Sequence, residues 1–317
     1  LDYLSRSSTI FLNNHTQQAI CSPSRISLLT GMRPDYTQVY DLITKMRDKR
    51  PDILTLPQYF KNNGYTTTGI GKIFDPRGVD NLLDEPSWSI PFIRAHKIPY
   101  PDHYGQPKLG FYQNTEIKAK IDKMIIENNL KRGNVGKFFN NKYKPPVSNS
   151  NAPDEAYTDG AIAKEAIRLI DRLSSSENPF FLAVGFKRPH LPFSAPKKYF
   201  DLYNPNKIPI EPFRQRAENV GDLAYHNSGE LQSYSEDGRE YILDSNQQLQ
   251  LDKDFERELI HGYYACVTFI DFQIGKIIKK LNQIGLMDNT IIVVWGDHGY
   301  HFGDHRLWNK HSNFEQA

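Results

Sequence analysis

The chain has 317 residues, a formal net charge of +2 and 38% hydrophobic residues. This length is sufficient for one large α/β core, and the near-neutral charge argues against a general nucleic-acid-binding protein. Two cysteines exclude a disulfide-rich scaffold, and the sequence contains no apolar run long enough to cross a membrane. Because the chain starts at Leu1 and stops at Ala317, we interpret it as an internal fragment, outside which a removed secretion signal would lie.

The first part of the chain predicts a helix end, a short strand around Ile10–Leu12 and a loop that presents Cys21. A short helix follows, because Pro23 suits a first helical turn and Gly31 suits the position after a helix end. A side chain at position 21 then lies beside free backbone N–H groups and the positive end of the helix dipole, which favour an anion. Arg25 adds donors suited to sulfate or phosphate oxygens. The alternative interpretation of Cys21 is a buried free cysteine.

Further along, segments with helical periodicity alternate with short apolar runs. The periodicity predicts helices over residues 52–63, 117–130, 157–173 and 254–284. Apolar runs predict strands over Tyr65–Ile70, Phe180–Phe186 and Thr290–Trp295, the last two buried in a sheet. The buried faces of the first and third helices consist of Leu56, Tyr59 and Phe60, and of Ile162, Ala166, Leu169, Ile170 and Leu173. This alternation predicts an α/β fold with a doubly wound, mostly parallel sheet flanked by helices.

Two long segments lack this regularity. Residues 94–150 are rich in proline, glycine and aromatic residues, and residues 203–252 are mostly polar. Long irregular excursions inside an α/β domain are usually functional or disordered. We therefore predict one core domain over residues 1–317 in which 94–150 and 203–252 are variable loop insertions, the first of them facing a substrate.

Polar residues follow directly after the predicted strands. Lys72, His190 and Asp297 hold such positions, and the carboxyl ends of parallel strands meet at one edge of a sheet. We therefore expect these three side chains to converge on Cys21. The sequence Asp297-His298-Gly299 also suits a metal site. The alternatives are a turn carboxylate that caps a helix, a solvated surface lysine and a histidine in a rigid proline loop.

The run Cys-x-Pro-Ser-Arg, followed by Leu29-Thr30-Gly31, resembles the signature of type I sulfatases, whose cysteine is oxidised after translation to formylglycine. Further segments resemble the iduronate-2-sulfatase-like branch: residues 17–20, 33–35, 40–41, 56–61, 88–89, 179–185 and 312–314. The resemblance implies an alkaline-phosphatase/sulfatase-like core, and we expect this chain to lack the first strand and the C-terminal subdomain of that family.

The resemblance also implies roles for single residues. Lys72 matches a lysine that binds both sulfate and formylglycine, and Lys310 matches the last sulfate-binding lysine. His190 matches the histidine that contacts the sulfate, and its ordinary pKa of about 6.5 suits protonation of the leaving alcohol. Asp297 and His298 match ligands of one calcium ion, which they share with the formylglycine made from Cys21.

The mechanism implied by the resemblance is covalent. One hydroxyl of hydrated formylglycine attacks the sulfur while His190 protonates the departing alcohol; the second hydroxyl then loses its proton, sulfate leaves and the aldehyde returns. Arg25 belongs to the same catalytic group. Asp75 stands where the branch has a histidine that handles the second hydroxyl, and we hypothesise that Asp75 is the base. The alternative is that Asp75 points away from the site.

The metal site is incomplete by this comparison. Calcium prefers six to eight oxygens, more than Asp297 and formylglycine supply. The family adds an adjacent Asp pair from its first strand, and no such pair precedes Cys21, so we expect this fragment to bind metal poorly. An alternative is a zinc site made from His298, His301, His305, Asp297 and Asp304, although Gly299 and Gly303 argue against the helical spacing that it needs.

These features predict a sulfuric-ester hydrolase. Its substrate would be a sulfated uronic acid or related sugar of a glycosaminoglycan or algal-type polysaccharide. Its partners would be this saccharide and a formylglycine-generating or other sulfatase-maturating enzyme, with no nucleic acid and no membrane. We expect export to a bacterial periplasm or exterior, or a lysosomal location in an animal. The alternatives are a phosphonate or phosphate-ester hydrolase of the same superfamily and a catalytically inactive carbohydrate-binding relative or fragment.

Overall fold

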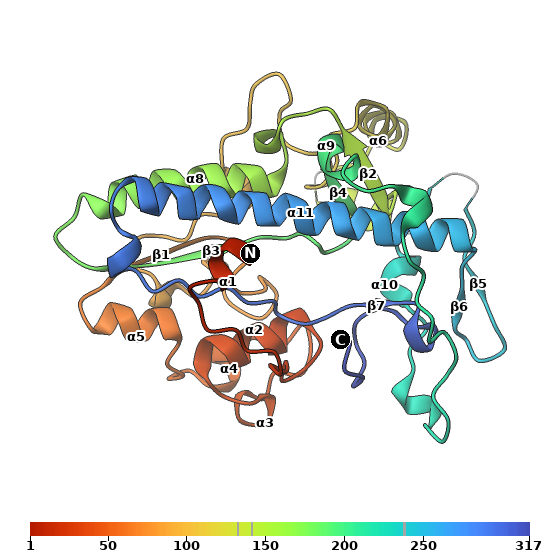
Figure 1. The fold of residues 1–317 in the computed structure, drawn as a ribbon, viewed down its shortest axis with the longest axis horizontal. Coiled ribbons are helices and arrows are strands. Elements are labelled where there is room, and N and C mark those ends of the chain that lie inside the picture. The colour runs from red at the N-terminus through yellow and green to blue at the C-terminus, as the bar shows by residue number, and fades with distance from the viewer. Residues whose placement is uncertain (132, 141, 237–238) are drawn as a thin grey trace. The chain divides into compact units, whose positions relative to one another are not determined.

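The computed structural model describes residues 1–131, 133–140, 142–236 and 239–317 (Figure 1). The chain folds as two compact units, each of which is described by itself. Unit 1 comprises residues 1–98, 162–186 and 271–299, and unit 2 comprises residues 99–161, 187–270 and 300–317. The prediction of one core domain with loop insertions at 94–150 and 203–252 stays a prediction.

Unit 1 is built around two parallel strands that lie side by side, β1 (Thr66–Gly71) and β3 (Phe180–Gly185) (Figure 1). The helices before β1 are α1 (Asp2–Ser5), α2 (Cys21–Thr30), α3 (Pro34–Thr37), α4 (Met46–Lys49) and α5 (Leu56–Asn62). Most of α8 (Thr158–Ser174) and the end of α11 (Lys253–Gln283) also belong to unit 1. There α11 lies beside α8, and Lys280 pairs with Asp171.

Helix α2 begins and ends where the sequence predicts. Gly31 follows its last residue in the left-handed conformation, with φ of 69°, and donates a hydrogen bond from its N–H to the carbonyl oxygen of Ser27 at 2.8 Å. Ile26 and Leu29 are buried in a cluster with Met46 and other apolar residues of unit 1. Burial of each such side chain contributes about 1.5–3 kcal/mol, which anchors the helix that carries Cys21 at its first position.

The other elements of unit 1 agree with the sequence in part. The predicted strands at 65–70 and 180–186 are confirmed, although most of β3 is only half-buried. The predicted stripe of α8 is buried at all five positions. Helix α5 begins at Leu56, after the cap residue Thr55, rather than at residue 52. Its predicted buried face is wrong, because Tyr59 is 53% exposed and Pro57 is the buried residue.

Two predicted strands of unit 1 are wrong. Thr290–Trp295 and Ile10–Leu12, which lie within the described residues, are not in strands. Their apolar side chains are largely exposed, with Ile291 at 93% and Leu12 at 88%. An apolar run becomes a strand only when a neighbouring strand pairs with its N–H and C=O groups. Among the described residues, no strand pairs with either segment.

Unit 2 consists of short elements around the first part of α11. Its helices are α6 (Thr115–Glu127), α7 (Val135–Phe139), α9 (Lys197–Phe200) and α10 (Gly229–Gln232). Its strands pair two by two: β2 (Val147–Ser150) with β4 (Phe193–Pro196) in parallel, and β5 (Ile242–Leu243) with β6 (Leu249–Gln250) and β7 (His301–Phe302) with β8 (Trp308–Asn309) in antiparallel. The helices predicted over 117–130 and 254–284 are confirmed. Parallel strand pairs flanked by helices confirm the predicted α/β class.

The core of unit 2 holds the hairpin of β7 and β8 in place. Trp308 is buried in this core, and the next residue, Asn309, accepts a hydrogen bond from the backbone N–H of Leu231 in α10 at 3.1 Å. Cys266 of α11 is fully buried in the same cluster, and its burial raises the pKa of its thiol to about 12. Among the described residues, no helix has the length and apolar character that spanning a membrane requires.

The close approach of β1 and β3 at Gly71 gives a first prediction. Gly71 has φ of +86°, and a Cβ there would lie 2.0 Å from the carbonyl oxygen of Gly185, whereas Gly64 has the same φ with nothing within 4 Å. Substitution by alanine at either position should cost about 1–2 kcal/mol of backbone strain. Gly71→Ala should lose a further 1–3 kcal/mol or so from the steric clash. Urea unfolding of both variants measures the difference, and equal losses would contradict this account.

Candidate active site

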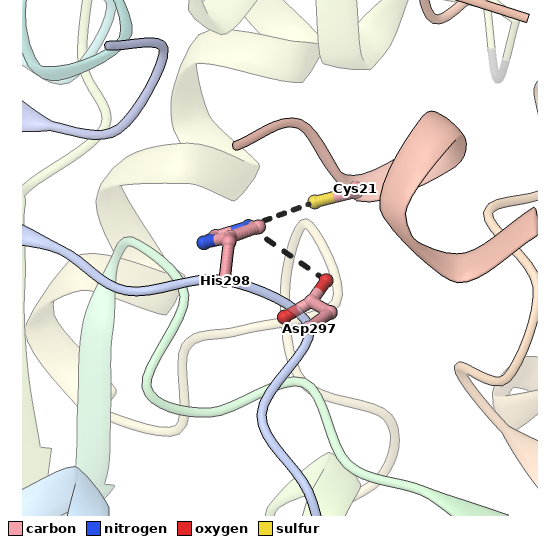
Figure 2. Close-up of side chains that lie close together, drawn as sticks. All are labelled: Cys21, Asp297 and His298. Carbon is pink, nitrogen blue, oxygen red and sulfur yellow. Dashed lines mark hydrogen bonds and ion pairs between the residues drawn. The ribbon is translucent and has the colours of Figure 1, made fainter. Parts of the chain in front are cut away.

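Cys21 lies at the centre of a polar cluster in unit 1. It is the first residue of α2 and is 3% exposed. Its Sγ accepts a hydrogen bond from Nζ of Lys72 at 3.3 Å and lies 3.4 Å from Nε2 of His298 (Figure 2). Lys72 follows β1, and its backbone N–H donates to the carbonyl oxygen of Gly185 at 2.8 Å. The sheet end therefore holds this ammonium group against the thiol.

Arg25, one helical turn after Cys21, joins three segments of unit 1. Its Nε donates to Oδ2 of Asp297 at 2.8 Å, and its Nη1 donates to the carbonyl oxygens of Lys72 at 2.5 Å and Ile73 at 3.0 Å. The guanidinium group is thus bonded to protein acceptors on two sides. The Arg25 side chain therefore fixes Asp297 and the segment after β1 relative to α2. The sequence did not predict this linking role of Arg25.

Asp297 is held as a carboxylate. Burial alone would raise the pKa of Asp297, but the positive charges of its neighbours, Arg25 foremost and Lys72 as well, outweigh burial and hold that pKa well below its usual range. The carbonyl oxygen of Asp297 accepts hydrogen bonds from the hydroxyls of Thr16, at 3.0 Å, and Ser24. Two neutral hydroxyls thereby fix the backbone of Asp297.

The orientation of His298 follows from its second ring nitrogen. Nδ1 lies 2.9 Å from the carbonyl oxygen of Gly299, which can only accept, so Nδ1 carries a hydrogen. Nε2 faces Sγ of Cys21 and lies 3.7 Å from Oδ2 of Asp297 (Figure 2). In the neutral ring this nitrogen carries a lone pair, which is the form that a metal ligand requires.

The side chains of Cys21, Asp297 and His298 could hold one metal ion. Their ligand atoms all lie within 4.8 Å of one another. In the part of the chain that the structure describes, no second group of this kind is present. The zinc site given as an alternative combines residues of both units and stays an alternative. His301 is buried, with Nδ1 on Asp304 and Nε2 2.6 Å from the hydroxyl of Ser312.

Asp75 lies near this cluster, and its carboxylate interacts with Arg77 and Lys72. Its carboxylate accepts hydrogen bonds from Nε and Nη2 of Arg77 at 2.8 and 2.9 Å, and it lies 3.6 Å from Nζ of Lys72. Burial would raise the pKa of Asp75, yet hydrogen bonds from Arg77 and the charge of Lys72 lower it to about 2. A carboxylate with so low a pKa is a weak proton acceptor, which argues against the hypothesis that Asp75 is a base.

Two more predicted site residues, His190 and Lys310, meet on one carboxylate in unit 2. Nζ of Lys310 donates to Oε2 of Glu230 at 2.6 Å, and Nε2 of His190 lies 3.1 Å from Oε1 of Glu230. Lys310 is 4% exposed, so its ammonium group is buried with this carboxylate. Sequence reasoning missed Glu230, because a single acidic residue in a polar segment carries no local signal of a long-range contact.

The described residues therefore form two groups, one in each unit. Unit 1 brings Cys21, Arg25, Lys72, Asp297 and His298 into one network of contacts. In unit 2, His190 and Lys310 both contact Glu230. That the residues of both groups act on one substrate stays a prediction.

Comparison with known proteins shows what this chain is similar to. Residues 1–317 match the family described as Sulfatase. The chain is 34% identical over 322 residues to Iduronate 2-sulfatase of Mus musculus and to that of Homo sapiens, and each match covers 100% of this chain and 53% of the relative. A protein described as Sulfatase from Formosa agariphila is 28% identical, with 100% of this chain and 56% of the relative covered. The chain thus spans about half the length of these relatives.

Solved structures share the fold at low sequence identity. A structure described as a complex with D-Glucosamine-2-N, 6-O-disulfate has a TM-score of 0.60 and 18% identity, covering 96% of this chain and 61% of that chain. Phosphonate Monoester Hydrolase of Agrobacterium radiobacter has a TM-score of 0.59 and 20% identity, covering 95% of this chain and 57% of that chain. These likenesses confirm an α/β fold of the alkaline-phosphatase and sulfatase type.

The family match adds what the fold alone does not show. The chain belongs to the sulfatase family, as the motif around Cys21 predicts. Members of this family use a modified cysteine and a divalent metal. The cluster at the start of α2 contains one cysteine together with a carboxylate and an imidazole that can bind such a metal.

The ion pairs of Asp75 give a prediction about stability and pH. Because its folded pKa of about 2 lies below its ordinary value of 3.8, Asp75 stabilises the fold above pH 4, and this contribution is lost as pH falls through 2. Asp75→Asn should therefore lower the free energy of unfolding by about 2 kcal/mol at neutral pH and by less as the pH falls. Urea unfolding at several pH values measures this loss.

The matched control is Asp52→Asn, because Asp52 is exposed in the same unit. This control should stay within about 0.5 kcal/mol of the unsubstituted protein. If Asp75→Asn lowers the free energy of unfolding by the same amount at every pH, the charge of Asp75 is not the cause of that loss.

Proposed function

We propose that the protein hydrolyses sulfate monoesters, with formylglycine made from Cys21 as its nucleophile. The observation that carries this proposal is the placement of the Cys21 side chain at the start of α2, 3.3 Å from Nζ of Lys72 and beside the Asp297–His298 pair. A sulfate ester requires positive charge for its oxygens, an in-line nucleophile and a proton for the leaving alcohol. Residues of this chain can supply each of these.

The chain's own residues supply the positive charge around position 21. The ammonium group of Lys72 is held by the end of β1 and can bind a sulfate oxygen and the position-21 side chain together. The free N–H groups and dipole of α2, which has ten residues, favour an anion at the same place. Arg25 adds its charge while it fixes Asp297. In this proposal Asp75 orients Lys72 rather than accepting a proton.

The proposed metal is one calcium ion, held by Asp297, His298 and the oxygen of oxidised position 21. When bound, a divalent cation polarises the ester and lowers the pKa of a bound hydroxyl. The three donors converge, which fits a single cation. Calcium prefers six to eight oxygens, so this group supplies only part of a calcium coordination sphere. The low pKa of Asp297 keeps its carboxylate available across the physiological range.

His190 and Lys310 are proposed to act on the substrate. An imidazolium at His190 can give the hydrogen on Nε2 to the departing alcohol oxygen, while the ring keeps its other hydrogen on Nδ1, 2.7 Å from the carbonyl oxygen of Leu191. Lys310 can bind a sulfate oxygen. The burial of Lys310 and the carboxylate that it shares with His190 support a functional role, because an exposed surface pair would contribute little.

The proposed substrate is a sulfated uronic acid or related sugar of a polysaccharide. The relatives named Iduronate 2-sulfatase, and another named Ulvan-active sulfatase, support this class. Lysine and arginine residues of segment 94–150 could bind the carboxylates of such a polymer. The proposal includes a sulfatase-maturating enzyme as a partner that oxidises Cys21. It also includes export from a bacterial cell, or a lysosomal location in an animal.

The proposal is tested by parallel assays of the matured protein on aryl sulfate, aryl phosphate and aryl phosphonate esters. We expect the sulfate ester to be hydrolysed fastest, and Cys21→Ala to lower kcat roughly a thousandfold or more because the nucleophile is lost. The control is Cys266→Ala, since Cys266 is fully buried in the core of unit 2 with a pKa raised to about 12. This control should keep its kcat.

Three outcomes would contradict the proposal in different ways. Faster hydrolysis of the phosphate or phosphonate ester would favour the other enzyme of the same superfamily. Binding of a sulfated saccharide without hydrolysis, in a protein that carries the oxidised residue, would favour a carbohydrate-binding relative. Equal activity of Cys21→Ala and the unsubstituted protein would remove position 21 from the mechanism.

A further inference from the structure

One carboxylate of unit 2 bridges an amine and an imidazole. Glu230 lies in the short helix α10, and its two oxygens are 2.6 Å from Nζ of Lys310 and 3.1 Å from Nε2 of His190. The side chains of Lys310 and Glu230 are largely buried. The backbone N–H of Leu231, next to Glu230, donates to Oδ1 of Asn309, so α10 is attached to the hairpin that carries Lys310.

Both ring nitrogens of His190 face hydrogen-bond acceptors. Nδ1 lies 2.7 Å from the carbonyl oxygen of Leu191, which can only accept, so Nδ1 carries a hydrogen. Burial alone would raise the pKa of Glu230, but the charge of Lys310 leads the causes that lower it to about 2. An ionised carboxylate also only accepts, so a hydrogen on Nε2 fits this contact. The geometry of both ring nitrogens favours an imidazolium ion over a neutral ring.

The other charged and titratable groups around this pair come from several segments of unit 2: Lys187 and Arg188 before His190, Lys144, His226 and His311, and the phenols Tyr234 and Tyr300. Burial and the neighbouring imidazoles lower the pKa of His226 to about 4, so His226 is neutral at pH 7. Burial raises the pKa values of both phenols, which are neutral as well. Glu230 therefore supplies a negative charge that favours protonation of His190. The several cations around the pair disfavour it.

We propose that Glu230 is a positioning residue that keeps His190 doubly protonated and holds it beside the ammonium group of Lys310. This inference rests on the proposed function in one respect, namely that His190 and Lys310 act on the sulfate ester. When the alcohol leaves, the bond from oxygen to sulfur breaks and the hydrogen on Nε2 moves to that oxygen. His190 then becomes a neutral ring with its hydrogen on Nδ1, and water restores the lost proton. Without Glu230, the surrounding cations would favour the neutral ring before the reaction starts.

The direct test is a nitrogen-15 NMR titration of the histidine rings, which needs no enzymatic activity. The signal of His190 is assigned by its loss in His190→Gln. In the unsubstituted protein we expect both nitrogens of His190 to be protonated at pH 7. Glu230→Gln should lower the pKa of His190 by one unit or more, roughly the effect of removing an opposite charge at this distance. Glu218→Gln, an exposed residue of the same unit, is the matched control and should leave the titration unchanged.

A second readout is the pH profile of kcat/KM on a sulfate ester. Loss of activity at high pH reports deprotonation of the acid, so Glu230→Gln should move that limb to lower pH. Activity should fall about tenfold near pH 8 and change little near pH 5. Glu230→Asp keeps the charge and should restore much of the lost activity. A purely structural role would instead lower activity by a similar factor at every pH.

A neutral His190 ring at pH 7 in the unsubstituted protein would overturn the inference, as would an unchanged titration in Glu230→Gln. If Glu230→Gln does not fold, the spectrum of the unsubstituted protein decides alone. A shifted titration in a protein without sulfatase activity would refute the proposed function and leave the positioning role intact.

Discussion

The guanidinium group of Arg25 is the contact on which the cluster around Cys21 depends. It bonds the carboxylate of Asp297 and the backbone after β1, so two segments far apart in the sequence are fixed to one helix. Together with the neighbouring groups, this side chain outweighs the effect of burial and keeps the pKa of Asp297 well below its usual range. The side chains of Cys21, Lys72, Asp297 and His298 are therefore held in one cluster, and in the proposed function this preorganisation lowers the reaction barrier.

Much of unit 1 and the long helices follow from local sequence. The helix after Cys21, the strand before Lys72 and the stripe of α8 depend on capping residues and periodicity, which act within a few residues. The run at 290–295 has strong β propensity yet is not a strand in the structure. Strand pairing is a long-range interaction, and the pattern of one segment cannot show whether a partner lies beside it.

The residues of the candidate site also differ in how far the sequence predicts them. Position after a strand was sufficient to select Lys72, which follows β1. Asp297 was selected with the help of its Asp-His-Gly motif, because the run before it is not a strand in the structure. The roles of Asp75 and Glu230 depend on partners that the sequence does not reveal, namely Arg77 beside the first and the His190–Lys310 pair around the second. The match of position 75 to a histidine of the related branch suggested a base at Asp75, whereas its contacts lower its pKa and make it a partner of Lys72.

The central claim is that position 21 carries the reacting group, and mass spectrometry of the peptide that contains it tests this most directly. The protein is produced in cells with a sulfatase-maturating enzyme, digested and treated with a reagent that captures aldehydes. We predict a Cys21 peptide of lower mass that the reagent captures, while the peptide with buried Cys266 keeps its thiol. An intact thiol at position 21 in this protein would contradict the account.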